Sequence, residues 1–279
     1  MNPTVEAIIL GIVEGLTEFL PVSSTAHIRI TQALLGQDIT DDYWKMFAVV
    51  IQLGAILAVV VYFWQRLVGF VASFARDRQA GQPLWQHPLA LVMISFVVTA
   101  GPCFLIDKKI GEHLENIPMM AVALIVGGIV MWWIDHHFSR NAPIHRLEEM
   151  TLRQAIVIGL AQILAAAFPG TSRSMATIAG GQLMGLSRPA ALEFSFFLSI
   201  PVMFAATGYK LTRFIFDDAA QANFAQWQLL TIGFLVSFLV ALAVIAWFMR
   251  WVSRHGFLPF AIYRVVAGLT LLAWIWSSK

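Results

Sequence analysis

The sequence predicts an all-α polytopic membrane protein with about six transmembrane helices plus two inverted re-entrant helical hairpins. Of its 279 residues, 59% are hydrophobic and only 12% are charged, whereas about 25% of the residues of a soluble domain are charged. Apolar stretches long enough to cross a hydrocarbon core of about 30 Å recur along the chain. Backbone polar groups in lipid must be paired within their own segment, and no stretch alternates like a barrel strand, so helix is the element that fits.

Six stretches are long and apolar enough to span a bilayer: 44–64, 88–107, 119–138, 190–212, 228–250 and 256–276. The longest connections between apolar segments are the polar stretches 65–87 and 135–153. We therefore predict a single integral membrane domain over residues 1–279. The first residues lack the basic region and cleavage site of a signal peptide, so we expect them to remain in the protein.

Two further apolar segments are each broken near the middle. The first, about 5–35, is broken at Pro21 and a Ser-Ser-Thr run. The second, about 152–186, is broken at Pro169-Gly170 and a Ser-Arg-Ser run. Each half has roughly 15 residues and is therefore about 23 Å long, too short for a full crossing. We expect each segment to form a re-entrant hairpin that enters and leaves by the same face.

The two broken segments resemble each other. A shift of about 148 positions lays Glu14 on Gln162, Pro21 on Pro169 and Ser24 on Ser172. Three predicted spans, an odd number, separate the segments, so the second enters from the opposite face. This predicts an inverted repeat, approximately 1–110 and 150–279, of the kind that often forms a binding site where its broken helices meet. Coincidence among apolar residues is the alternative.

The placement of lysine and arginine predicts the orientation. If the hairpins do not cross, the face opposite the N-terminus collects nine of these residues: Arg66, Arg76, Arg78, Arg140, Arg146, Arg153, Arg188, Arg250 and Arg254. The N-terminal face collects six: Lys45, Lys108, Lys109, Lys210, Arg213 and Lys279. Cytoplasmic loops carry the excess, so both termini are predicted to lie outside the cytoplasm.

Two carboxylates precede the first break. Glu14 and Glu18 are four residues apart and therefore share a helix face. They repel each other, and burial in lipid makes their ionisation costlier still. They need a cation, a shared proton or water, and a divalent metal is one way to hold both. A water-lined face that merely tolerates them is the alternative.

A candidate nucleophile and base follow the break. Pro21 stops the first half-helix, and Ser23 or Ser24 can cap the second. His27 lies three residues after Ser24, on the same helix face and within reach of its hydroxyl or of a group bound beside it. A serine and a histidine at a buried helix N-terminus form a candidate nucleophile–base pair. Capping alone would also explain the serines.

The second break reads Pro169-Gly170-Thr171-Ser172-Arg173-Ser174, a pattern suited to an anion. Gly170 lets the backbone approach a ligand closely, and the helix that follows presents free N–H groups. Arg173 adds a planar fork that matches phosphate oxygens. At membrane depth its charge needs an anionic ligand or an ion pair with Glu14 or Glu18. The two breaks together fit a phosphate or diphosphate better than a neutral solute.

Other polar residues within the spans rank lower. Asp135-His136-His137 ends a span and fits a solvated boundary better than a metal site. Arg264 and Glu193 are predicted to snorkel or to join a polar network. The net charge of +2, with no basic run, excludes a nucleic-acid partner.

At the two breaks the sequence resembles a known family. The stretch from Glu14 to His27, EGLTEFLPVSSTAH, resembles the glutamate-rich motif of the undecaprenyl-diphosphatase, or bacitracin-resistance, family, and 169–174 resembles its second motif, PGxSRS. Further matches lie at 47–60, 150–155, 187–203 and 257–264. The sequence departs from the pattern at Ala26 and Met175, where glycine is common, and at Ala48, where an acidic residue is expected. These departures concern substrate preference.

The resemblance implies a bacterial inner-membrane phosphatase that hydrolyses undecaprenyl diphosphate to undecaprenyl phosphate and phosphate, recycling the lipid carrier for peptidoglycan synthesis. It implies a divalent cation, Mg²⁺ or Ca²⁺, at Glu14 and Glu18, a site open to the periplasmic side, and bacitracin acting on the substrate rather than on the protein. The implied catalytic residues are Glu14, Glu18, Ser24, His27 and Arg173. The implied substrate-binding residues are Ser23, Thr25, Gly170, Thr171, Ser172 and Ser174.

We expect Ser24 to attack the terminal phosphorus in line, with His27 as base and then acid. His27 itself or a metal-activated water stays open as the nucleophile. The main rival is a transporter or flippase for an anionic lipid or phosphate-bearing solute, which needs no nucleophile beside a histidine. A structural membrane subunit would leave the buried charges unexplained. The expected partners are the polyprenyl diphosphate and membrane lipid, and a homo-oligomer is left open.

Overall fold

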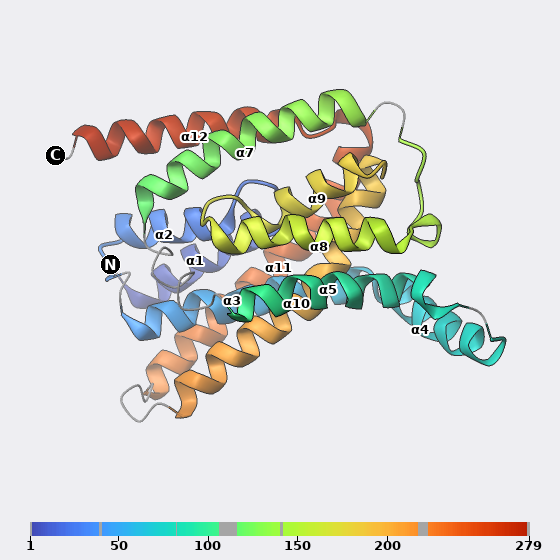
Figure 1. The fold of residues 1–279 in the computed structure, drawn as a ribbon. Coiled ribbons are helices and arrows are strands. Elements are labelled where there is room, and N and C mark those ends of the chain that lie inside the picture. The colour runs from blue at the N-terminus through green and yellow to red at the C-terminus, as the bar shows by residue number, and fades with distance from the viewer. Residues whose placement is uncertain are drawn as a thin grey trace.

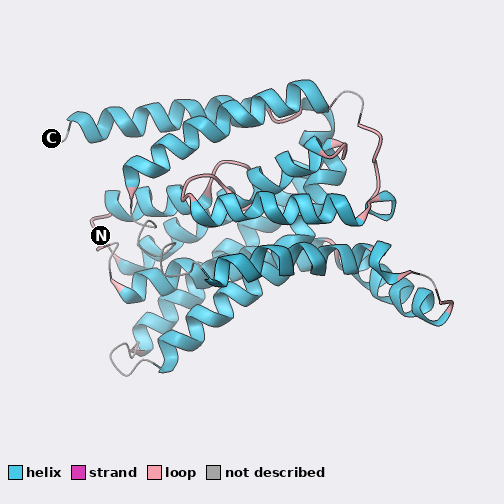
Figure 2. Ribbon diagram, viewed as in Figure 1, coloured by secondary structure: helices cyan, strands magenta, loops and turns pink. Residues whose placement is uncertain are grey.

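A computed structural model of the chain describes residues 2–38, 41–81, 83–105, 116–139, 142–216 and 223–277. Helices joined by loops make up this described part, and it contains no strand (Figure 2). In chain order the helices are α1 (Pro3–Thr17), α2 (Ser24–Leu34), α3 (Asp42–Tyr62), α4 (Trp64–Gln79), α5 (Pro88–Leu105), α7 (Ile117–Phe138), α8 (Leu152–Ala167), α9 (Arg173–Leu183), α10 (Arg188–Phe216), α11 (Phe224–His255) and α12 (Leu258–Ser277).

Six of these helices are long and apolar enough to cross a membrane: α3, α5, α7, α10, α11 and α12. Each coincides with one of the six predicted spans, so the prediction of a polytopic helical membrane protein is confirmed. The start of α1 and the end of α12 lie at the same end of the bundle (Figure 1). Lys108, Lys109, Arg140 and Lys279, which entered the orientation prediction, lie outside the described residues.

Short polar side chains fix where several helices begin. The side chain of Asn2 accepts a hydrogen bond from Thr4 N, and that of Asp41 from Trp44 N. Asn223 and Gln226 form a capping box, in which each side chain accepts from the other's backbone N–H. These side chains pair N–H groups that the helix itself leaves free.

The polar stretch 65–87 is not merely a connection, because most of it folds into α4, with a short 3₁₀ turn at Leu84–Gln86. The prediction was incomplete here. The segment is too polar for a span, but a helix that does not cross the membrane needs only one apolar face. Arg66 on α4 bridges Glu148 (2.8 Å) and Glu193 of α10 (2.9 Å), so Glu193 joins a polar network as expected.

Each broken segment forms a pair of helices that folds back on itself. Near the ends of the first pair, Gln37 Nε2 donates to Glu6 Oε2 (2.8 Å); near the ends of the second, Gln154 Nε2 donates to Met184 O (3.0 Å). Figure 1 shows the two pairs reaching the middle of the bundle from opposite ends. α1 and α8 have 15 and 16 residues, and α2 and α9 have 11 each. How they enter a bilayer, and the boundaries 1–110 and 150–279, stay predictions.

Glycine allows the helices around these pairs to approach closely. α1 and α3 both pack on α11, α5 packs on α8, and α7 packs on α12. A side chain at Gly54 would strike the carbonyl of Phe234 on α11, and a Cβ at Gly159 would lie 2.7 Å from Ser95 O on α5. Such contacts between small residues are typical of helix packing in membranes, where lipid is as apolar as the core.

We predict that Gly54→Ala destabilises the protein by about 1–3 kcal/mol, because the rigid α11 backbone must move to admit the methyl group. Gly208→Ala on α10 is the matched control, since a Cβ there meets nothing within 4 Å. Thermal unfolding in detergent, followed by size-exclusion chromatography, measures both. Equal melting temperatures for the two variants would contradict the close-packing argument.

Candidate active site

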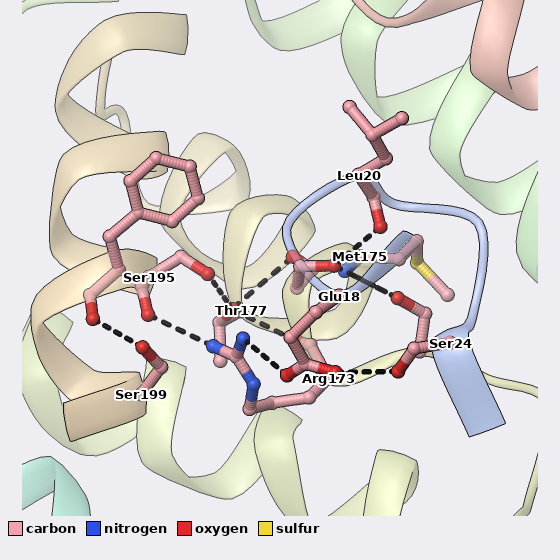
Figure 3. A network of polar contacts seen from close by, with 11 residues as sticks. Glu18, Leu20, Ser24, Arg173, Met175, Thr177, Ser195 and Ser199 are labelled. Atoms are coloured by element: carbon pink, nitrogen blue, oxygen red, sulfur yellow. Dashed lines mark hydrogen bonds and ion pairs between the residues drawn. The ribbon is translucent and has the colours of Figure 1, made fainter. Parts of the chain in front are cut away.

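The breaks of the two helix pairs meet in the middle of the bundle (Figure 3). Ser174 Oγ, in the first turn of α9, donates to Leu20 O in the α1–α2 break at 3.0 Å. The contact joins residues 154 positions apart in the sequence. It confirms the expectation that the two broken segments come together at one place.

Glu18 lies at the centre of this meeting point and touches both pairs. Its Oε1 lies 3.1 Å from Nη2 of Arg173, and its Oε2 accepts a hydrogen bond of 2.5 Å from Ser24 Oγ. Glu18 and Ser24 are buried, and the Arg173 side chain is only 12% exposed. A single carboxylate therefore holds the candidate nucleophile with one oxygen and the candidate phosphate clamp with the other.

Arg173 is also anchored from α10. Its Nη1 donates to Ser195 O at 3.1 Å, while Ser195 Oγ and Thr177 Oγ1 share a hydrogen bond of 2.6 Å. Ser195 and Thr177 are buried, and the sequence analysis missed both. One signal existed: Ser195 and Ser199 lie four apart in an apolar span and thus mark one polar helix face. Fixed at two points, the guanidinium is held in place before any ligand binds.

The second helix of each pair begins at a serine with a left-handed backbone. Ser23 has φ 75° and Ser172 has φ 73°, the only non-glycine residues with positive φ in the described part of the chain. Such values cost energy for residues with a Cβ, and they cluster at functional sites. Ser172 Oγ caps α9 by accepting from Met175 N (3.3 Å). The structural counterpart of Ser172 is therefore Ser23, not Ser24. The shift that superposes the two repeats is thus one position larger after the break than before it.

The hydrogen bonds of His27 go to groups other than Ser24. Its Nδ1 lies 2.7 Å from the carbonyl oxygen of Ser23, and its Nε2 lies 2.6 Å from the hydroxyl of Tyr263 on α12. Both ring nitrogens are thus occupied, and the expected Ser24–His27 pair is replaced by Ser24–Glu18 and His27–Tyr263. Tyr263 could not be found from local spacing, since it lies 236 positions from His27.

Glu14 is fully buried, and no donor among the described residues bonds to either of its carboxylate oxygens. Its carboxyl group lies within hydrogen-bonding reach of that of Glu18, so the two could share a proton, and it also faces the charge of Arg173. Gln162, its counterpart in the second repeat, is likewise buried, and its amide has no hydrogen-bond partner among the described residues. A buried carboxylate without a partner is costly. Its two free oxygens beside Glu18 fit the oxygen ligands that Mg²⁺ and Ca²⁺ prefer.

In the described residues no group of three or more His, Cys, Asp or Glu side chains surrounds this point. A cation held by Glu14 and Glu18 would therefore take its other ligands from hydroxyls, carbonyls, water or a bound phosphate. Mg²⁺ is commonly held in this way, by one or two carboxylates and substrate phosphates.

Arg264 of α12 fastens both breaks at once. It is fully buried, and it donates to Pro21 O in the first break (3.0 Å) and to Gly170 O (3.1 Å) and Thr171 O (3.0 Å) in the second. A further bond reaches Ala123 O on α7 at 3.1 Å. The sequence indicated a polar network for this residue, but not that it ties the two breaks together.

The remaining predicted site residues lie around these contacts. Thr25 is partly buried in the first turn of α2, and Gly170, with φ 94°, is held against the backbone of Met120. The methyl group of Met175 lies against Gly127 beside the Arg264 guanidinium: a Cβ at Gly127 would lie 2.8 Å from that methyl, so the missing side chain of Gly127 makes room for it. Ala26 lies in an apolar cluster with Met120 and Leu124.

Asp135 is not part of a solvated boundary. It is buried and accepts from Arg188 Nε (2.7 Å) and Gln182 Nε2 (2.9 Å), which ties α7 to α9 and α10. The prediction was wrong for Asp135 only, since the neighbouring His136 and His137 are exposed as expected and dominated the local pattern.

The fold and site together define a multi-pass helical membrane protein with a buried site of hydroxyl, carboxylate and guanidinium groups, suited to an anionic ligand. Comparison with known proteins narrows this class. The chain belongs to the family described as bacitracin resistance protein BacA, whose model matches residues 7–270.

Curated relatives match over nearly their whole length. A protein of Koribacter versatilis named undecaprenyl-diphosphatase is 52% identical over 98% of this chain and 99% of its own. Proteins of the same name from Polaromonas naphthalenivorans and Caldanaerobacter subterraneus are 43% and 41% identical, each over 98% of this chain and 96% of their own. The resemblance noted in the sequence is confirmed.

We predict that Arg264→Met lowers the melting temperature sharply, because it leaves buried carbonyls of both breaks unpaired at about 1–3 kcal/mol each. Arg264→Lys should be intermediate, since an ammonium cannot span the same acceptors. Arg254→Met, at an exposed position near the end of α11, is the control. Thermal unfolding in detergent measures all three, and a wild-type melting temperature for Arg264→Met would refute the fastening role.

Proposed function

We propose that this chain hydrolyses undecaprenyl diphosphate to undecaprenyl phosphate and inorganic phosphate. The observation that carries the proposal is the Glu18 carboxylate, which holds the Ser24 hydroxyl and the Arg173 guanidinium together in a buried site. Membership of the BacA family and the names of the curated relatives support the same activity. An oriented hydroxyl, a base and a phosphate-binding cation are the groups that transfer of a phosphoryl group requires.

Ser24 is the nucleophile in this proposal, and Glu18 is its base. The hydroxyl hydrogen already points to Glu18 Oε2 across 2.5 Å, so it passes to the carboxylate as Ser24 Oγ bonds to the terminal phosphorus. This changes the role first expected for His27, whose ring nitrogens are bonded elsewhere. The anhydride bond breaks, and the bridging oxygen leaves with its electron pair as undecaprenyl phosphate.

Arg173 and the two helix N-termini receive the terminal phosphate. The fork of Arg173 matches two phosphate oxygens, and α2 and α9 begin at Ser24 and Arg173, where their free N–H groups favour negative charge. A phosphate would replace Glu18 as the counter-ion of Arg173 and so release the carboxylate for proton transfer. Water then attacks the phosphoserine, and Glu18 returns its proton to Ser24 Oγ as the bond between oxygen and phosphorus breaks. Both hydrogens of the water leave on dihydrogen phosphate, and Ser24 and the ionised Glu18 are restored.

A divalent cation, Mg²⁺ or Ca²⁺, belongs to the proposal. Glu14 would hold it with its two unpaired oxygens, and Glu18 would contribute from the neighbouring turn. When bound, the cation supplies positive charge against the phosphoryl oxygens. Its presence would also relieve the cost of two buried carboxylates side by side.

We place the protein in the bacterial inner membrane, with its site open to the periplasmic side and the two broken segments as re-entrant hairpins. The arginine excess on one face and the short lengths of α1, α2, α8 and α9 support this arrangement. In this proposal bacitracin acts on the lipid substrate rather than on the protein, and a homo-oligomer is left open. A transporter or flippase is not favoured, because transport gives no reason to bond a serine hydroxyl to a buried carboxylate.

The first test is release of phosphate from undecaprenyl diphosphate by the purified protein in detergent, where no gradient exists. Ser24→Ala and Glu18→Gln should each lower kcat by about 10²-fold or more, since each removes a partner of the same step. His27→Gln should cost less. Ser253→Ala, an exposed serine of α11, is the control. No release by folded wild-type protein with any metal would overturn the proposal and favour the transporter.

The metal assignment has a separate test in Glu14→Gln, which keeps the shape of the side chain but removes its charge. We expect the Mg²⁺ or Ca²⁺ concentration for half-maximal activity to rise about tenfold or more, because a ligand charge is lost. Glu193→Gln is the control, since Glu193 pairs with Arg66 instead. Chelator should abolish wild-type activity. An unchanged metal requirement in Glu14→Gln would show that the cation lies elsewhere.

A further inference from the structure

The hydrogen bonds of His27 fix which ring nitrogen carries its proton. Nδ1 faces the carbonyl oxygen of Ser23 at 2.7 Å, and a carbonyl can only accept, so Nδ1 carries the hydrogen. In a neutral ring Nε2 is then an acceptor, and the Tyr263 hydroxyl, 2.6 Å away, must be its donor. The rings stack with centroids 5.6 Å apart. In this neutral form the lone pair of Nε2 is turned towards Tyr263 on α12.

This pair lies at the outer edge of the buried site. Glu18 and Ser24 are 6% and 8% exposed, His27 is partly exposed, and Tyr263 is 46% exposed. Burial therefore decreases along α2 from Ser24 to His27 and then across to α12. The polar site ends at the phenol, which is a side chain suited to a boundary between polar and apolar surroundings.

The surface beyond Tyr263 is apolar and open. Ile262, Val266 and Leu269 of α12 are 56%, 56% and 55% exposed. Ile262 precedes the tyrosine, and Val266 follows it by one helical turn. An apolar chain leaving the site past Tyr263 would meet this face of α12 without crossing a charged group.

We propose that Tyr263 and His27 form an outer subsite that receives the lipid-bearing phosphate of the diphosphate. The inference rests on the proposed function, which puts the terminal phosphate at Ser24 and Arg173. A diphosphate whose terminal group lies there extends its second phosphate outwards, and its polyprenyl chain must end in lipid. Tyr263 lies between the buried site and the exposed apolar face of α12.

The phenol is the recognising group. In the free site it donates to His27 Nε2, and with substrate bound it turns to donate to an oxygen of the lipid-bearing phosphate, leaving Nε2 to accept from water. The guanidinium of Arg264, whose charge acts on His27, is committed to backbone carbonyls of both breaks. Arg264 fastens α12 at the adjacent residue, so it also fixes where Tyr263 stands.

The two halves of the site can be separated by two product inhibitors. Inorganic phosphate occupies the inner half, whereas the single, lipid-bearing phosphate of farnesyl phosphate, a soluble lipid monophosphate, occupies the outer half. Tyr263→Phe removes the donor and keeps the ring. We expect it to raise the inhibition constant of farnesyl phosphate about tenfold, as loss of one hydrogen bond to a charged group does, and to leave that of inorganic phosphate unchanged.

Tyr209→Phe is the matched control, because Tyr209 is 50% exposed on α10. It should change neither constant. An equal rise in both constants for Tyr263→Phe would show a general structural role and overturn the subsite, as would no change in either. An inactive wild-type enzyme would instead refute the proposed function, so the two failures are distinguishable.

A second measurement needs only the wild-type protein and therefore holds even if Tyr263→Phe does not fold. Protein labelled with ¹⁵N-histidine contains seven such residues, and the missing signals of His27→Gln assign those of His27. We expect Nδ1 to be the protonated nitrogen, and the Nε2 signal to shift on addition of farnesyl phosphate but not of inorganic phosphate. A proton on Nε2 in the free protein, or the same response to both ligands, would overturn the proposal.

Discussion

A non-helical break inside an apolar bundle has backbone carbonyl groups without helical partners, and two such breaks of this chain meet in its interior. Water pairs such groups in a soluble protein, but in a dry interior each unpaired group costs several kcal/mol. The side chain of Arg264 pairs several of these carbonyl groups. It donates to Pro21 O in one break and to Gly170 O and Thr171 O in the other. Because the same guanidinium holds both breaks, their relative position is fixed, and every distance in the site depends on it.

The buried ion pair of Glu18 and Arg173 adds charge to this frame without adding much stability. Desolvating two charges costs about as much as their attraction returns, so such a pair is weak evidence of a structural role. The geometry of this pair is better explained by a role in preparing Arg173 to bind an anion. Arg173 is held by Ser195 as well as by Glu18, and would therefore need little reorganisation if a phosphate replaced the carboxylate, as proposed. Sites arranged in advance in this way stabilise developing charge most effectively.

The features that could be predicted from the sequence are those encoded locally. Span length and apolarity identify the six long helices, and Pro21, Pro169 and Gly170 mark the breaks, because each acts on its own backbone. The partners of the site residues could not be predicted in this way. Spacing along α2 allowed His27 to reach Ser24, but its partner comes from α12, and Ser24 turns back to Glu18. Helical spacing defines a shared face and does not say which neighbouring element covers that face.

The repeat supplies the symmetry of the site, and the differences between its halves supply the chemistry. Ser23 and Ser172 have nearly the same left-handed backbone, so both halves present a helix N-terminus to the centre. The first half adds carboxylates at Glu14 and Glu18, whereas the second has the neutral Gln162 and adds Arg173. Two identical halves would place like charges together at the centre, at a high cost in a dry interior. Opposite charges on the two halves let the breaks approach, and the Glu18 carboxylate then holds the Ser24 hydroxyl with one oxygen and the Arg173 guanidinium with the other.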